Sequence, residues 1–240
     1  MEASGEVYKA NKEHFVLVHG AGHGAWCWFK LACLLRGSGH RVSCIDHAGT
    51  AGSLVDPDDV RSFDKYDAPL MDFMAALPDG HKQLVCIFLL PVDIDDSSSV
   101  TVVWQGAPDL SEFGDVFDLR FGLGDGCPPT SVALREEHQR IILYQQCSHE
   151  DSTLASILLR PWPAALSTAR FGHVDDGAES AVNAVPRVYI KTTNDHMVKQ
   201  EQQEAMIRRW PPREVVAMDT DHSPFFSAPE RLLELILKSL

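Results

Sequence analysis

The chain has 240 residues, 45% of them hydrophobic, and a net charge of −13 at pH 7. This length suits one α/β domain over residues 1–240, and the mean hydropathy of −0.12 is typical of a soluble protein. The negative charge argues against nucleic acid or an anionic membrane surface as a partner. Because no apolar run reaches the ~18 residues of a membrane span and no signal-peptide core is visible, we expect a cytoplasmic protein.

The first predicted elements surround a glycine-rich turn. Residues His14–Trp28 read HFVLVHGAGHGAWCW, in which Phe15–Val18 form an apolar run typical of a buried parallel strand. An amphipathic helix is predicted over Trp26–Leu35. A strand, a turn and a helix in this order place free backbone N–H groups at the helix N-terminus. Such groups attract a phosphate, a carboxylate or a developing oxyanion.

Three interpretations of this turn are open. Gly20, Gly22 and Ala25 fit the G-x-G-x-x-A pattern of a dinucleotide site. Asp46 follows the next strand, where the ribose-binding acid of an NAD(P)-binding Rossmann enzyme would stand. Alternatively, the His-Gly pair belongs to the strand-to-helix turn of an α/β-hydrolase and supplies an oxyanion-hole N–H. The third interpretation is a tight turn without a ligand.

Strands and helices alternate along most of the remaining chain. The periodicity predicts strands at Arg41–Ile45, Gln83–Leu90, Arg187–Lys191 and Glu214–Met218, and helices at Phe63–Leu77, Gln200–Trp210 and Glu230–Leu240. Ser227 and Glu230 have the spacing of a capping box for the last helix. This alternation predicts an α/β fold with a doubly wound, mostly parallel sheet and right-handed crossovers.

Residues from about 106 to 172 interrupt the alternation. They contain glycine- and proline-rich turns and two predicted helices, Arg135–Gln146 and His149–Leu159. Ser148 and Asp151 resemble a capping box for the second helix. We expect this all-helical insertion to form a cap over an α/β active site.

Six cysteines are distributed along the chain without any CxxC pair. Most of them lie inside apolar segments. We therefore interpret them as small buried hydrophobic residues in a reducing compartment, with no disulfide and no metal site.

Two polar residues follow late strands. Asp195 lies just past Arg187–Lys191, and His222 lies just past Glu214–Met218, at the edge where α/β sheets place their chemistry. The order matches the Ser…Asp…His order of α/β-hydrolases. There the acid orients the imidazole, and the histidine acts first as general base and then as acid. A turn residue and a surface histidine without a role are the alternative, but no dinucleotide enzyme needs such a pair.

The chain resembles the plant methylesterase and hydroxynitrile lyase family of α/β-hydrolases. The stretch HFVLVHGAGHGAWCW, the turn TTND and the loop DHSPFF carry this resemblance. The stretches PDLSEFGDVFDLRFGLG, VPRVYIK and EQQEAMIRRWPP are similar to the branch that acts on methyl indole-3-acetate. The resemblance implies a helical cap, no metal and no organic cofactor. It also implies hydrolysis of small carboxylate methyl esters to the acid and methanol.

The resemblance assigns roles to individual residues. Asp195 and His222 match the triad acid and base, and Ala21 offers an oxyanion-hole N–H. Ser223 stands where the lyase members carry a lysine, which argues against lyase activity. The expected partner is a small methyl ester, or its free acid, of indole-3-acetate, jasmonate or salicylate. The sequence ranks none of these three and does not indicate the oligomeric state.

The nucleophilic serine of the family is missing. The family places it in a G-x-S-x-G elbow between a strand and a helix, whereas here Val85 is joined directly to Cys86, between halves that resemble two separate strands. The elbow, its helix and one central βαβ crossover are absent. Cys86 in an apolar strand and Ser97–Ser99 in a polar loop are weak substitutes. Loss of the serine from a comparable triad lowers the rate by ~2 × 10⁶-fold.

Several accounts of such a chain are compatible with its sequence. It is a methylesterase that is weak or inactive in this form, or a non-catalytic protein that binds a small carboxylate in a capped apolar pocket. It is alternatively a splice or gene-model product whose full-length form is the enzyme. The clean flanks of the missing block favour this last origin. The NAD(P)-binding enzyme remains the second alternative.

Overall fold

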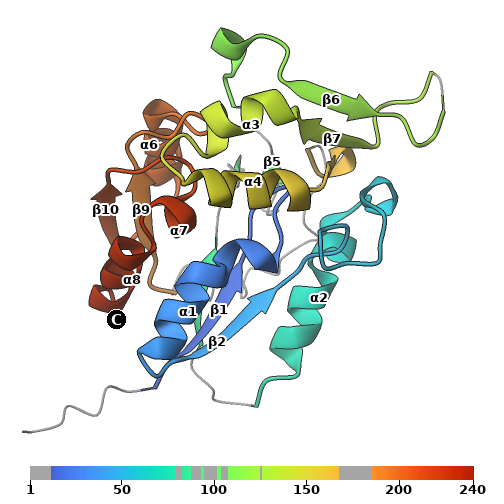
Figure 1. Ribbon diagram of the computed structural model, residues 1–240. Helices are drawn as coiled ribbons and strands as arrows, with labels where there is room; N and C mark the ends of the chain where they lie inside the picture. The colour runs from blue at the N-terminus through green and yellow to red at the C-terminus, as the bar shows by residue number, and fades with distance from the viewer. Residues whose placement is uncertain are drawn as a thin grey trace, which may run out of the picture.

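The computed structural model describes residues 12–78, 83–87, 93–94, 102–103, 108–124, 126–167 and 185–240 (Figure 1). Its first sheet is parallel and has β1 (His14–Val18) between β2 (Arg41–Ile45) and β3 (Gln83–Ile87). All five side chains of β1 are buried, because β1 has a strand on each side and both of its faces are covered. The predicted first two strands are thus confirmed.

The third strand contains the junction at which the sequence analysis placed the missing block. Val85 and Cys86 both lie inside β3 and pair with Val16 and Leu17 of β1 in one continuous register. The two halves therefore form a single strand, as predicted. Residues 88–90, the rest of the predicted strand, lie outside the described residues.

The helices beside this sheet begin and end close to the predicted positions. The predicted helix after the glycine-rich turn is in fact a short 3₁₀ segment, η1 (Ala25–Trp28), followed by α1 (Phe29–Gly37). After the 3₁₀ turn η2 (Pro57–Asp59), α2 (Phe63–Ala75) starts where the Ser62 Oγ accepts the Lys65 N–H, and it runs through Pro69.

The C-terminal part of the chain forms a second parallel sheet. It consists of β9 (Val188–Thr192) and β10 (Glu214–Met218), joined through α6 (Gln200–Arg209). The chain ends with α7 (Pro224–Ser227) and α8 (Pro229–Lys238). The predicted capping box at Ser227 is wrong: α8 has Ala228 at its N-cap position without a side-chain cap, and the Ser227 hydroxyl donates to Asp221 instead.

The two parallel sheets share no strand pairing among the described residues. In an uninterrupted parallel sheet an inner strand is buried on both faces. Here β9 is only half-buried over most of its length, and Val215 of β10 is 46% exposed, whereas Phe15 and Leu17 of β1 are fully buried. This is the arrangement expected when a centre strand is removed.

Among the described residues, side-chain packing and not strand pairing connects the two halves. Helix α1 packs against α8, and one core cluster contains Leu17 of β1, Leu35 of α1, Met218 of β10 and Leu235 of α8. The burial of apolar side chains therefore supplies the cohesion that strand hydrogen bonds supply in a continuous sheet.

The cap lies over the carboxyl ends of β1 and β2 (Figure 1). It contains η3 (Ser111–Phe113), β6 (Phe117–Arg120), β7 (Ser131–Leu134), α3 (Glu136–Leu143), α4 (His149–Leu158), β8 (Trp162–Pro163) and η4 (Ala164–Ser167). The Ser148 Oγ accepts the Asp151 N–H at the start of α4, as predicted.

An all-helical cap is not what the structure contains. Strands β6, β7 and β8 form an antiparallel sheet beside the two helices. These strands are short, and β6 is mostly exposed, so its sequence FDLR lacks the apolar run that marks a buried strand. A further two-residue antiparallel pair joins β4 (Asp93–Ile94) and β5 (Val102–Val103).

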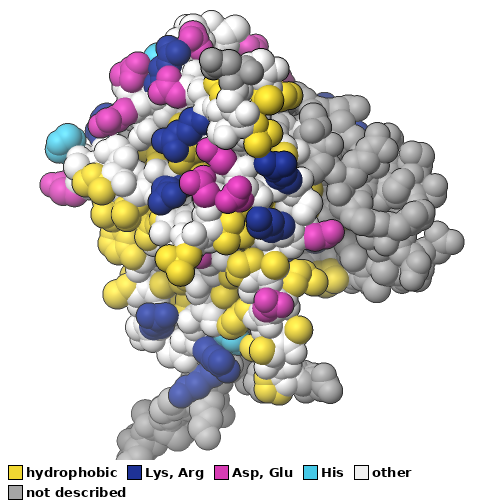
Figure 2. Space-filling model, turned by 90° about the vertical axis from the view of Figure 1, so that its right-hand side faces the viewer, with side chains coloured by type: hydrophobic (Ala, Val, Ile, Leu, Met, Phe, Trp, Pro, Cys, Tyr) yellow, Lys and Arg dark blue, Asp and Glu magenta, His cyan; other side chains and the backbone are white. Residues whose placement is uncertain are grey.

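Charged side chains of both signs and apolar side chains are mixed over the face in Figure 2. The net charge of −13 is therefore not gathered into one acidic patch on the visible part of that face. None of the helices in the described part of the chain has the length and apolar character of a membrane span.

The divided sheet predicts reduced stability. We expect the chain to unfold at a lower denaturant concentration than a member of the resembled family that retains its elbow, because the lost strand takes its hydrogen bonds and buried surface with it. Urea unfolding of both proteins, followed by circular dichroism, measures the two midpoints. Equal midpoints would show that repacking compensates fully for the missing crossover.

The packing between α1 and α8 predicts that truncation of a core side chain there destabilises the whole chain. Leu35→Ala removes a fully buried side chain from the shared cluster and is expected to lower the free energy of unfolding by about 2–5 kcal/mol. Leu54→Ala, at a fully exposed leucine, is the matched control and should change it by less than about 0.5 kcal/mol. Similar losses in both variants would contradict the assignment of this core.

Candidate active site

Asp195 and His222 meet at the carboxyl ends of β9 and β10. Asp195 is the third residue after the end of β9, and His222 is the fourth residue after the end of β10. The His222 Nδ1 lies 2.9 Å and 3.0 Å from the two carboxylate oxygens of Asp195, and both side chains are buried. Because a carboxylate only accepts, Nδ1 carries the proton, and Nε2 is the basic nitrogen of the neutral ring.

The surroundings of Asp195 hold its carboxylate in the charged form. Its Oδ1 accepts the N–H groups of Met197 and Val198 at 2.9 Å and 2.8 Å, and its Oδ2 accepts the Thr192 hydroxyl at 2.9 Å. Burial opposes ionisation, but the attraction of His222 and these hydrogen bonds outweigh it, so the pKa of Asp195 lies below its usual value. The carboxylate is thereby fixed in position and charge.

The glycine-rich turn is held by two neutral histidines, His19 of the His-Gly pair and His23, for whose side chains the sequence analysis predicted no role. The first, His19, donates from Nδ1 to the Gly20 carbonyl at 2.8 Å, and its Nε2 accepts the His47 N–H at 3.2 Å. Burial and the nearby His47 lower the pKa of His19 from 6.5 to about 4. The ring therefore stays neutral and connects the end of β1 to the end of β2.

These contacts orient the N–H of Ala21. The Gly20 carbonyl and the Ala21 N–H belong to one peptide group, and the carbonyl accepts both the His19 ring and the His23 N–H. Hydrogen bonds to a carbonyl polarise its peptide and strengthen the N–H on the other side. Among the described residues no acceptor takes the Ala21 N–H. It is therefore a fixed, polarised donor.

The second histidine, His23, connects the turn to the cap. Its Nδ1 donates to the Ala21 carbonyl at 3.0 Å, so its Nε2 accepts the Tyr144 hydroxyl at 2.8 Å. Complete burial, with a smaller contribution from the nearby His222, lowers the pKa of His23 from 6.5 to about 3. Tyr144 could not be found from the sequence, because nothing in the stretch LYQQC marks it.

Asp46 is used inside the turn. Its Oδ1 accepts the Ala25 N–H at 2.7 Å, and its carboxylate lies between Gly24 and Gly52, where a Cβ on either glycine would collide with it. The N–H group at the start of the helical segment thus already has a carboxylate partner from the chain itself. This position does not fit the ribose-binding role that the dinucleotide interpretation required of Asp46.

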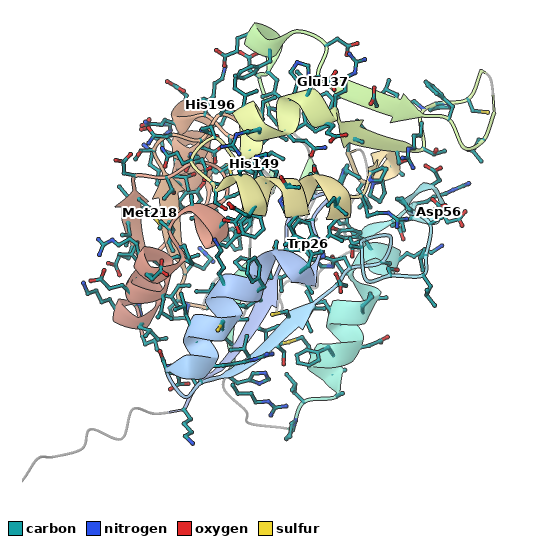
Figure 3. All side chains as sticks on the ribbon, in the orientation of Figure 1. Trp26, Asp56, Glu137, His149, His196 and Met218 are labelled. Atoms are coloured by element: carbon teal, nitrogen blue, oxygen red, sulfur yellow. The ribbon has the colours of Figure 1, made fainter. Side chains whose placement is uncertain are left out.

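Aromatic packing brings the turn and the His222 loop together. The ring of His23 stacks on Trp26 with 5.6 Å between centroids and contacts Phe225 edge-on at 5.8 Å. Trp26 in turn stacks on Phe226 at 6.1 Å. Figure 3 marks Trp26 at the start of the helical segment after the turn. The stretches HGAWCW and DHSPFF, far apart in sequence, therefore form one cluster beside His222.

The residues considered as substitutes for the serine are only partly described. Cys86 belongs to β3, of which the backbone alone is described, and Ser97–Ser99 lie outside the described residues. Ser223, at the position of the lyase lysine, is fully buried.

Comparison with known proteins identifies close relatives of the chain. The profile of the alpha/beta hydrolase family matches residues 15–235. Methylesterase 17 of Arabidopsis thaliana is 38% identical over 258 aligned residues, which cover 94% of this chain and 91% of the relative. Because this alignment is longer than the 240 residues of the chain, the relative has residues that find no counterpart here.

Solved structures agree with this similarity. The crystal structure of the methylesterase MES16 from Arabidopsis matches with a TM-score of 0.76 and 31% identity, over 95% of this chain and 98% of the other. Tomato methylketone synthase I, complexed with 2-tridecanone, matches with a TM-score of 0.78 and 28% identity, over 95% and 97% of the two chains.

The neutral histidines predict that stability decreases in mild acid. His19 and His23 titrate near 6.5 in the unfolded chain but at about 4 and about 3 in the folded one. The unfolded chain therefore binds more protons in this interval, and the free energy of unfolding falls as the pH is lowered from about 6.5 toward 4. Urea unfolding at a series of pH values measures this slope.

Two variants test whether His19 contributes to this pH dependence of the free energy of unfolding. His19→Asn should be less stable at pH 7 and show a shallower slope, because one of the two depressed groups is gone. His149→Asn, at an exposed histidine on α4, is the matched control and should leave the slope unchanged. A wild-type slope in His19→Asn would contradict the neutral, buried state of His19.

Proposed function

The chain belongs to the alpha/beta hydrolase family and, within it, to the plant methylesterases, and from this premise we propose that it is a carboxylic methyl-ester hydrolase whose turnover is weak. The observation that carries the proposal is the buried hydrogen bond between His222 and Asp195, 2.9 Å long. A base and its orienting acid are retained at the carboxyl ends of the strands, where α/β sheets carry out their chemistry.

His222 is the general base in the proposed reaction. Its Nε2 takes a proton from water while the water oxygen attacks the ester carbonyl. The Ala21 N–H stabilises the negative oxygen of the tetrahedral intermediate. When the intermediate collapses, the C–OCH₃ bond breaks, and methoxide takes the proton from the His222 imidazolium to leave as methanol. Asp195 stabilises the imidazolium through both carboxylate oxygens.

The absence of a serine in the elbow position sets the expected rate. A triad without its serine loses a factor of ~2 × 10⁶, equivalent to ~8–9 kcal/mol of activation barrier. The alignment with Methylesterase 17, longer than this chain, supports a deletion, and the direct junction between Val85 and Cys86 inside β3 is where we place it. A product of altered splicing or of a faulty gene model fits this pattern.

The proposed substrates are methyl esters of small carboxylic acids. The candidates are methyl indole-3-acetate, whose branch of the family the sequence resembles, methyl jasmonate and methyl salicylate, and they are not ranked. The methylketone synthase complexed with 2-tridecanone shows that a protein of this fold accommodates a small apolar molecule. We place the protein in the cytoplasm.

A second candidate function is binding of the free acid. Without a hydroxyl to acylate, the site retains the Ala21 N–H and, when protonated, His222 as donors for a carboxylate. Such a protein would bind a hormone-like acid without turnover.

A hydrolysis assay with methyl indole-3-acetate tests the proposal. We expect slow release of methanol by the purified chain, its loss in His222→Ala, and no change in His149→Ala, the exposed control. Insertion of the elbow segment of Methylesterase 17 between Val85 and Cys86 should raise the rate by several orders of magnitude.

Two results would decide against the proposal. Turnover as fast as that of Methylesterase 17 would mean that another nucleophile serves the site. Saturable binding of indole-3-acetate by calorimetry, without turnover before or after the insertion, would favour the binding protein.

A further inference from the structure

A short segment of the cap contacts the glycine-rich turn, the Asp195 loop and the His222 loop, which together form the candidate site. This segment, Tyr144–Cys147, connects α3 to α4, and we call it the clasp. The Tyr144 hydroxyl donates to His23 of the glycine-rich turn, and the Gln145 side chain donates to the Asn194 carbonyl at 2.5 Å, next to Asp195. The Gln146 N–H and the Cys147 thiol both donate to Asp221, next to His222.

A second contact joins α3 to the Asp195 loop. The ring of His196 reaches the Ile141 carbonyl, with 2.7 Å between Nδ1 and the oxygen. The loop of Asp195 is thus tied to the cap from both sides, through its neighbours Asn194 and His196. The cap and the site loops therefore form one hydrogen-bonded unit.

Asp221 is the anchor of the clasp on the His222 loop. Its side chain is fully buried and accepts four hydrogen bonds. Two come from the clasp to Oδ2, at 2.9 Å from the Gln146 N–H and 3.2 Å from the Cys147 thiol. Two come from its own loop to Oδ1, at 3.1 Å from the Ser223 N–H and 2.8 Å from the Ser227 hydroxyl.

All four donors are neutral. A buried carboxylate is costly unless its lone pairs are occupied, and Asp221 meets this condition only while the clasp is in place. Burial and the neighbouring Asp221 raise the pKa of the Cys147 thiol, which keeps it protonated and able to donate. Separation of the clasp from the loop would leave Oδ2 buried without a donor.

We propose that Asp221 is a positioning residue that fixes His222 by locking its loop to the clasp. The inference rests on the proposed function, in which His222 is the base. In this arrangement the cap contributes to the geometry of the base.

The variant Asp221→Asn distinguishes the hydrogen bonds that Asp221 accepts from the clasp from those that it accepts from its own loop. The amide can retain one oxygen for Ser223 and Ser227, but its NH₂ group then faces the Gln146 N–H, and two donors cannot bond. The variant thus disconnects the clasp while it preserves the loop bonds and the shape of the side chain. Asp151→Asn is the matched control, because Asp151 is also a buried carboxylate of the cap, and it bonds Lys30 and Ser148 instead.

The readout is the imidazole of His222, observed by ¹H–¹⁵N NMR in the full chain. We expect the proton on Nδ1, held by Asp195, to give a protected low-field signal in the wild type and in Asp151→Asn. In Asp221→Asn this signal should shift and exchange faster with water. A folded Asp221→Asn variant with an unchanged signal would overturn the proposal.

Milder variants keep the test valid if Asp221→Asn does not fold. Cys147→Ala removes one clasp bond and Ser227→Ala removes one loop bond, and each should shift the same signal by a smaller amount. An unchanged signal in both would overturn the proposal equally. Because the signal does not depend on turnover, a failed ester assay with a shifted signal would refute the proposed function and leave the role of Asp221 standing.

Discussion

The hydrogen bond between His222 and Asp195 is the interaction on which the structure of the site depends. It needs a charged, buried carboxylate, and such a group is stable only because Thr192 and two backbone N–H groups also donate to it. It also needs two loops from different strands at a fixed separation. The chain meets the second need through the aromatic cluster and the cap. These hold the site, although the parallel strands that the structure describes form two separate sheets.

The division of the sheet explains why so much of the site is held by side chains. In a continuous α/β sheet the strands themselves fix the spacing of the loops at their carboxyl ends. Here β3 and β9 are not paired with each other among the described residues. The spacing depends instead on the core between α1 and α8, and on hydrogen bonds such as those from Tyr144 to His23 and from the clasp to Asp221.

The sequence predicts what is local, and long-range contacts determine the rest. Strands β2 and β10 have the predicted bounds, because their apolar character is contained within five residues. Asp195 and His222 were found from their places after late strands, and the structure brings them together, although their catalytic roles remain a proposal. The exposed strands of the cap were missed, because β6 owes its existence to pairing with β7 and not to an apolar pattern of its own.

The misassigned polar residues follow the same rule. Ser227 has the spacing of a capping residue, but Asp221, six positions earlier, offers its hydroxyl a buried acceptor. Asp46 stands at the sequence position of a ribose-binding acid, but the fold places its carboxylate against the Ala25 N–H, which donates to it. Each local motif was recognised correctly as a pattern, and a partner brought in by the fold decided its use.

The central proposal is that His222 and Asp195 act as base and acid, with no nucleophile at the elbow position for them to activate. Incubation with a fluorophosphonate ester, followed by mass spectrometry of the intact protein, tests it most directly, because this reagent forms a stable bond with an activated hydroxyl. We predict no adduct with this chain and one adduct with Methylesterase 17 under the same conditions. A stoichiometric adduct on any side chain of this protein, lost in His222→Ala, would contradict the claim.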